Sequence, residues 1–117
     1  MVGLASGLVL GNLGFTHCSI EEVGVLRSIP NITIVSPSDT LELYKVLNEV
    51  FNLKGSFYIR LTGGSNSKII NKSDYNFTVG KSVELLSGQD VSIIGCGNIL
   101  GNCLEAANIL KNKNINC

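Results

Sequence analysis

The only histidine of the chain lies in a short segment that carries several groups able to exchange protons or bind oxygen atoms. His17 follows Thr16 and a glycine-containing turn at residues 11–14, and it precedes a pair of acidic residues. An imidazole titrates near neutral pH when it is unperturbed, so it can donate or accept a proton there. A loop directly before a helix also gives a side chain access to ligands. His17 is therefore the first candidate catalytic residue, and a capping or surface histidine is the alternative.

The neighbours of His17 offer two further possibilities. The Thr16 hydroxyl can orient the histidine loop and contact a substrate, or it can satisfy local backbone groups. Cys18 beside His17 suggests a nucleophile and its base, but adjacent side chains of an extended segment point apart, so we set this aside. Cys96, Cys103 and Cys117 are also far apart and form no close pair, which favours reduced thiols and no metal site.

Three other charged residues have positions that call for a partner. Arg60 lies in the otherwise apolar run 57–61, where it needs a carboxylate partner or a site at the end of the strand, so it is a candidate substrate-binding residue that contacts an anion. Arg27 and Asp39 lie near expected helix ends. We assign them a structural role, in an ion pair or capping network that fixes two strand-to-helix connections.

The elements that position these residues alternate between strand and helix. Buried strands are expected at residues 2–10, 32–35 and 57–61, since these runs are apolar or β-branched. The first helix is expected from Ser19, as its cap, to about residue 28, because Pro30 excludes helical geometry just before it. This order of elements indicates an α/β fold with a partial parallel sheet and crossover helices.

The second helix is expected to begin after Ser38 or Asp39 as its cap and to end before Gly55. Apolar residues recur through it at helical spacing and predict one buried face. They are Leu43, Val46, Leu47, Val50 and Phe51.

The second half of the chain is separated from the first by a polar stretch, which predicts domains at 1–63 and 80–117 with a linker at 64–79. After the linker, strands are expected at 81–86 and 91–94 and a helix at 100–110, whose face carries Leu104, Ala107 and Leu110. Ile115 is expected to begin a strand that the chain does not complete. We therefore expect a fragment or one product of a split gene, or else a chain that folds by donating its edges to a partner.

The turn at residues 95–101 has the spacing Gly-x-Gly-x-x-x-Gly between a strand and a helix. A dinucleotide loop requires a different spacing and an acidic residue about 20 positions later. The segment is better interpreted as a tight strand-to-helix turn.

The charge balance excludes some partners. Nine basic and nine acidic residues cancel, and no run of lysine or arginine marks a nucleic-acid or membrane surface. No apolar run approaches the roughly 20 residues that cross a bilayer, and no signal-peptide pattern is present. We expect a cytoplasmic protein.

Three blocks of residues in order, within residues 11–61, resemble the transketolase family. They are Gly14-Phe15-Thr16-His17 with Ile20-Glu21-Glu22, then Arg27-Ser28-Ile29-Pro30-Asn31, then Pro37-Ser38-Asp39. The resemblance implies that residues 1–63 are the C-terminal part of a thiamine-diphosphate-binding fold of the pyrimidine type. It continues more weakly to Cys117, so that 80–117 would begin the second α/β domain, the family's C-terminal domain.

The resemblance also implies a function. A transketolase-like enzyme transfers a two-carbon ketol or related acyl group with thiamine diphosphate, and the residue matching His17 hydrogen-bonds a substrate oxygen. Magnesium and the diphosphate belong to another domain of the family, and the glutamate that activates the cofactor lies upstream of the matched region. We therefore expect a partner that binds the diphosphate, a homo- or hetero-dimer, a small sugar or 2-oxo substrate, and no activity of this chain alone.

Two departures leave the substrate open. Many transketolases have an aspartate that contacts a sugar hydroxyl where this chain has Leu13, and an arginine that contacts the substrate phosphate where it has Gly63. A deoxyxylulose-phosphate synthase, the β subunit of a 2-oxoacid dehydrogenase, and a non-catalytic remnant that binds a partner are the alternatives.

Overall fold

The computed structural model describes residues 1–63, 69–70 and 74–117. Its helices and strands are β1 (Val2–Gly3), the 3₁₀ turns η1 (Gly11–Leu13) and η2 (Phe15–His17), α1 (Glu22–Arg27), β2 (Ile32–Val35), α2 (Thr40–Val50), β3 (Ser56–Arg60), the 3₁₀ turn η3 (Gly97–Ile99) and α3 (Leu100–Lys111). None of the helices within these described ranges is long and apolar enough to cross a membrane.

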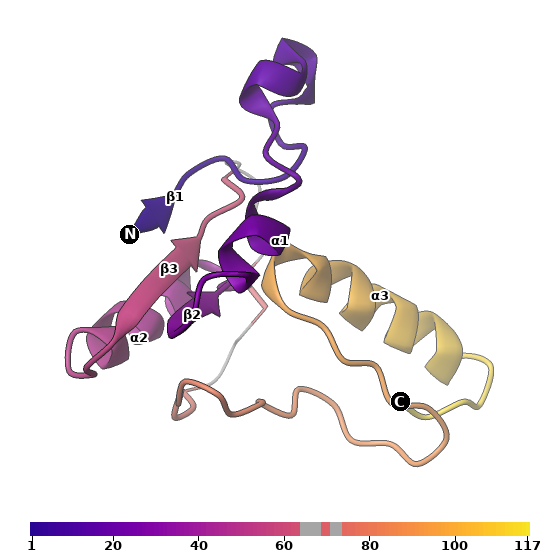
Figure 1. Ribbon diagram of the computed structural model, residues 1–117. Helices are drawn as coiled ribbons and strands as arrows, with labels where there is room; N and C mark the ends of the chain where they lie inside the picture. The colour runs from indigo at the N-terminus through magenta and orange to yellow at the C-terminus, as the bar shows by residue number, and fades with distance from the viewer. Residues whose placement is uncertain (64–68, 71–73) are drawn as a thin grey trace.

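The three strands form a parallel sheet in the order β1-β3-β2 (Figure 1). Strand β3 lies in the middle, where Tyr58 pairs with Ile34 of β2 and Ile59 pairs with Val2 of β1. Tyr58 and Ile59 are buried because the central strand of a parallel sheet is covered on both faces. The predicted α/β fold with a partial parallel sheet is confirmed.

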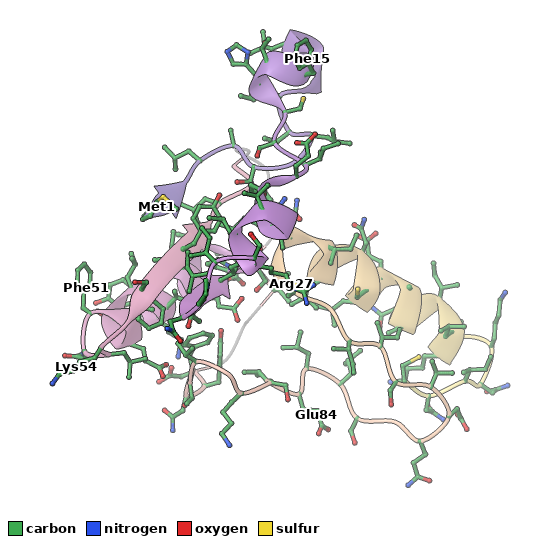
Figure 2. The ribbon with its side chains drawn as sticks, in the orientation of Figure 1. Met1, Phe15, Arg27, Phe51, Lys54 and Glu84 are labelled. Atoms are coloured by element: carbon green, nitrogen blue, oxygen red, sulfur yellow. The ribbon has the colours of Figure 1, made fainter. Side chains whose placement is uncertain are left out.

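Helix α2 connects β2 to β3 and begins where the sequence predicts. Asp39 is its N-cap, and the Oδ1 atom of Asp39 accepts a hydrogen bond from the backbone N–H of Glu42 at 2.8 Å. Val46 is fully buried, as expected for the apolar face. Phe51 is not part of this face, because it follows the last helical turn and is 84% exposed (Figure 2).

The expected first strand at 2–10 is wrong beyond Gly3. Ala5 and Gly7 have φ values of 56° and 84°, and the left-handed backbone at these positions ends the extended conformation. The chain then turns away from the sheet instead of continuing along it. The first helix also begins later than expected, at Glu22, and the Ser19 hydroxyl bonds to the Glu22 carboxylate rather than capping a backbone N–H.

The strands expected at 81–86 and 91–94 are absent from the described structure, in which neither segment is part of a sheet. A strand is stabilised by a ladder of hydrogen bonds to a neighbour. Here the backbone N–H groups of Asp90 and Val91 both donate to the Asn116 carbonyl, which is not a ladder. The described residues do not supply the pairing partner that a strand needs.

The expected strand start at Ile115 is also wrong. The backbone N–H of Ile115 donates to the Leu110 carbonyl at 3.1 Å, and Asn114 has a φ of 61°. These two features form a C-terminal cap of α3, in which a left-handed residue lets the chain satisfy the last carbonyls. Helix α3 itself is confirmed, and Ala107 is buried on the predicted face.

The predicted linker at 64–79 lies partly outside the described residues. Of the described part, the backbone N–H of Ile70 donates to Asp39 Oδ2 and that of Val79 donates to Glu49 Oε1, each at 2.8 Å. Lys45 Nζ lies 4.4 Å from the centre of the Tyr75 ring. This part of the segment therefore packs along α2, and the division into two domains stays a prediction.

Tyr75 is expected to ionise later than an ordinary tyrosine. Burial, followed by the negative charges of Glu42 and Asp39, raises the pKa of Tyr75 to about 12. Its hydroxyl is buried and has no hydrogen-bond partner among the described residues. The folded chain holds this proton up to a higher pH than the unfolded chain does. The contribution of Tyr75 to the free energy of unfolding is therefore fully present below pH 10 and is lost as pH rises towards 12.

An ultraviolet titration of tyrosinate should show one tyrosine that ionises near pH 12, and Tyr75→Phe should remove this ionisation. A wild-type titration that is complete by about pH 11 would contradict the buried position of Tyr75.

The chain exposes much more surface than a compact protein of its mass. Its accessible area is 8492 Å², whereas about 6,200 Å² is expected for a folded monomer of this size. Its radius of gyration is 15.6 Å, against about 13 Å for a compact domain. The excess includes large apolar side chains of the N-terminal region, which is typical of surfaces that another polypeptide covers. They include Leu4, Leu8, Leu13, Phe15 and Ile20.

Candidate active site around His17

His17 lies on a protruding segment, residues 8–18, which we call the His17 loop. The loop consists of η1 and η2, joined by Gly14 in a left-handed conformation with a φ of 76°. Its base is closed by a bridge between Gly7 and Ser19, in which the Gly7 N–H donates to the Ser19 carbonyl at 2.7 Å. Figure 1 shows the loop in purple, extending away from the sheet. The sequence correctly predicted an accessible loop ahead of α1.

The His17 side chain is exposed, and its Nδ1 atom lies 2.9 Å from the Thr16 hydroxyl oxygen. When the Thr16 hydroxyl donates to Nδ1, the neutral ring carries its proton on Nε2. Nε2 has no partner among the residues that the structure describes. The ring can therefore offer Nε2 to a ligand while Thr16 orients it.

The tip of the His17 loop is apolar. Phe15 is 90% exposed and Leu13 is 51% exposed. Figure 2 shows Phe15 at the far end of the loop. Leu13 replaces the aspartate that the resemblance predicts, so an apolar side chain lies near His17 in sequence where a sugar hydroxyl would otherwise find an acceptor.

Arg60, the candidate anion contact, has a carboxylate partner within the chain. Its Nε atom donates to Glu22 Oε1 at 2.6 Å, and the side chains of Arg60 and Glu22 are only 20% and 12% exposed. The other carboxylate oxygen of Glu22 accepts from the Ser19 hydroxyl at 3.0 Å. This arrangement answers the requirement that an arginine in an apolar strand be paired.

The environment of Glu22 favours its ionised form. Burial by itself raises the pKa of the Glu22 carboxyl, but the hydrogen bonds from Arg60, from its own backbone N–H and from Ser19, with the charge of Arg60, bring it below its ordinary value. Glu22 therefore contributes stability at neutral pH, and this contribution is lost as pH falls through the lowered pKa.

Arg27 and Asp39 are not brought together as an ion pair. Arg27 is the last residue of α1 and is exposed, and it forms no ion pair within the described part of the chain. Asp39 is buried and caps α2. Of the two structural alternatives, the cap is therefore observed for Asp39, and Arg27 has the position of a basic residue at the negative end of a helix dipole.

Gly63 follows β3 with a φ of 74°, and a Cβ atom there would lie 3.8 Å from the Cα of Ala5. There is space for a side chain, but the left-handed backbone disfavours an arginine at this position, which is where the resemblance implies one. The phosphate contact expected from that arginine is not replaced by another described residue of the same loop.

The residues that the sequence did not single out are Glu22 and Ser19. Ser19 is expected from the sequence only as a helix cap, and an acidic residue such as Glu22 is common in a first helical turn. The available signal was the lone arginine in the apolar run 57–61, which required a carboxylate. Pairing Arg60 with Glu22 needed the three-dimensional fold, since 38 positions separate them.

The sequence and the fold of the chain are similar to those of known proteins. Residues 1–66 match the family described as "Transketolase, pyrimidine binding domain". The chain is 30% identical over 115 residues to a subunit of the apulose-4-phosphate transketolase of Phocaeicola vulgatus, covering 98% of this chain and 37% of that protein. It is 29% identical over 116 residues to "Putative transketolase C-terminal section" of Methanocaldococcus jannaschii, again covering 98% of this chain and 37% of that protein.

A solved structure is similar as well. "Split gene transketolase, inactive beta4 tetramer" superposes with a TM-score of 0.81 at 25% identity, covering 98% of this chain and 36% of that one. The chain thus spans little more than a third of the length of these relatives. The matched family covers more than half of the chain and includes the sheet and the His17 loop, so the chain belongs to the transketolase family through its pyrimidine-binding domain.

Proposed function

We propose that this chain is a fragment or subunit of a transketolase-like, thiamine-diphosphate-dependent enzyme that transfers a two-carbon ketol or related acyl group. The observation that carries the proposal is the exposed His17, whose Nδ1 is engaged by Thr16 and whose Nε2 has no partner among the described residues. Family membership supports it, and so do the names of the relatives, one a transketolase subunit and the other a C-terminal section.

His17 has the task of binding a substrate oxygen. Thiamine diphosphate, when bound, supplies a centre that stabilises a carbanion. The Nε2–H of His17 donates a hydrogen bond to a carbonyl or hydroxyl oxygen of the substrate. When the ring is doubly protonated and its Nδ1–H donates to the Thr16 hydroxyl oxygen, it can give the Nε2 proton to the substrate oxygen and later take it back at Nε2, which is typical of general acid–base catalysis. Thr16 positions the ring and is close enough in sequence to contact the same substrate.

The residues of the His17 loop fit the substrate side of such a site. They provide an imidazole, a hydroxyl and exposed apolar side chains. No group of three or more histidine, cysteine, aspartate or glutamate residues that could hold a metal is found among the described residues. In this proposal, magnesium and the diphosphate are held by a separate diphosphate-binding domain or subunit, as the resemblance implies.

A partner is part of the proposal. The large exposed surface of the chain and the subunit names of its relatives support a homo- or hetero-dimer or a higher assembly. The related solved structure is described as an inactive β4 tetramer of a split-gene transketolase, which supports the proposal that this chain needs a second kind of subunit for activity. The proposed substrate is a small sugar or 2-oxo compound and the proposed compartment is the cytoplasm. Because Leu13 and Gly63 replace residues that contact a sugar hydroxyl and a phosphate in many transketolases, the proposal does not specify those two groups of the substrate.

Calorimetry with thiamine diphosphate and magnesium tests the proposal. The cofactor should bind to a mixture of this chain with its diphosphate-binding partner and not to the chain alone. Cofactor binding in neither sample would favour the second candidate, a non-catalytic remnant, which the substitutions at Leu13 and Gly63 support. His17→Gln should bind the cofactor as tightly as the parent, because His17 is proposed to contact the substrate.

A further inference from the structure

Arg60, the last residue of β3, and Leu61, which follows it, hold the two ends of the His17 loop. On the entering side, the Ser6 N–H donates to the Leu61 carbonyl at 3.0 Å, and Ser6 is 2% exposed. On the leaving side, Arg60 bonds to Glu22, which in turn bonds to Ser19. Both ends are therefore fixed at the carboxyl end of the central strand.

The loop beyond its base is held only by local bonds. The backbone N–H groups of Gly11, Leu13, Gly14, His17 and Cys18 each donate three residues back along the chain. Within the described structure, no hydrogen bond or ion pair joins residues 8–18 to the rest of the molecule. The direction in which the loop points is consequently determined at its base, and Figure 1 shows the loop rising from the region where α1 begins.

The Glu22–Arg60 pair is the ion pair that the described residues form at that base. A guanidinium bonded to a carboxylate at 2.6 Å is a short, charge-assisted hydrogen bond. Both groups are largely withdrawn from solvent, where such a bond resists competition from water. The Arg60 side chain also lies under the loop's entry, since a Cβ atom added to Gly7 would be 3.3 Å from its Nη2 atom.

We infer that Glu22 and Arg60 are positioning residues that fix the direction of the His17 loop, with Ser19 linking the pair to the loop's leaving end. The positioning of His17 for a substrate rests on the proposed function, whereas the control of the loop's direction does not. The pair thus explains why a strand that is otherwise apolar carries an arginine at its last position.

Four variants of the full chain test this inference: Glu22→Gln, Arg60→Met, the double variant, and Asp74→Asn as a control. Asp74 belongs to the other described ion pair, with Lys45, and its side chain is 98% exposed. In ¹⁵N relaxation measurements without cofactor, order parameters of residues 11–17 should fall from about 0.85 to below about 0.6 in the first three variants and stay unchanged in the control.

The double variant separates positioning from stability. Each single variant leaves one largely buried charge unpaired and should lower Tm by several degrees, but the double variant removes both charges and should recover most of this loss. The His17 loop should nevertheless stay mobile in the double variant, while β2 and β3 remain ordered. A double variant in which the loop is ordered again, or one in which loop and sheet loosen together, overturns the inference.

Ser19→Ala covers the case in which the charge variants fail to fold. It deletes only the hydroxyl that joins Ser19 to Glu22, and the order parameters of residues 11–17 should fall while Tm changes little. An unchanged loop in Ser19→Ala also overturns the inference. Because no cofactor is present, a negative result here is distinct from a failure of the proposed enzymatic function.

Discussion

His17→Gln is expected to lower kcat/KM of the assembled enzyme by about 10²–10⁴-fold. Glutamine is similar in length and can still donate a hydrogen bond, but it cannot take up a proton near neutral pH. The loss corresponds to about 3–5.5 kcal/mol of transition-state stabilisation. Most of the loss should appear in kcat, because a proton transfer to the substrate oxygen lowers the energy of the transition state and not that of the bound substrate. Steady-state kinetics with the partner present measures it.

Cys18→Ser is the matched control on the same loop. Cys18 neighbours His17, but we assign it no chemistry, so its kinetics should equal those of the parent. A large loss for Cys18→Ser would revive the hypothesis of a cysteine nucleophile with His17 as its base. A His17→Gln enzyme with parental kcat/KM would remove the catalytic assignment of His17.

The elements that the sequence predicted correctly are those determined by neighbouring residues. The extent of β2 follows from its β-branched run and the preceding Pro30, and the start of α2 follows from Asp39 as its cap. The exposure of His17 follows from its place in a loop rich in turn residues. Each of these depends on interactions over a few positions, which a sequence displays directly.

The elements that the sequence did not predict depend on distant partners or on backbone conformation. The segments 81–86 and 91–94 have strand-like patterns, but a pattern does not supply a neighbouring strand. The first strand ends early because Ala5 takes a left-handed conformation, which is rare outside glycine and has no sequence signal here. The pairing of Arg60 with Glu22 likewise required the sheet and α1 to be in place.

At Gly97 the C-terminal half of the chain approaches the end of strand β2 closely. It starts η3 with a φ of 70°, and a Cβ atom there would lie 2.6 Å from the Ser36 hydroxyl oxygen. Ser36 follows β2 directly, so the backbone at Gly97 packs against the end of that strand. The sequence predicted a tight turn at residues 95–101, and the structure adds that a Cβ atom at Gly97 would meet the Ser36 hydroxyl.

Gly97→Ala is expected to lower the free energy of unfolding by about 2–4 kcal/mol. One part comes from the left-handed backbone, which costs an L-residue about 1–2 kcal/mol, and the rest from the collision with Ser36. Urea unfolding measures the change. Gly101→Ala is the matched control, because its Cβ would meet nothing within 4 Å and it lies inside α3, where alanine is favoured.

Ser36→Ala in the Gly97→Ala background separates the two causes. It removes the oxygen that the new methyl group meets, while the Cβ of Ser36 at 3.6 Å remains an ordinary contact. The double variant should therefore recover the steric part of the loss and keep the part due to φ. If Gly97→Ala unfolds like the parent, neither the left-handed backbone at Gly97 nor its contact with Ser36 is present in solution. If Ser36→Ala recovers part of the loss, residues 97–111 rest on the end of β2 in solution, because only the steric part of the loss depends on Ser36.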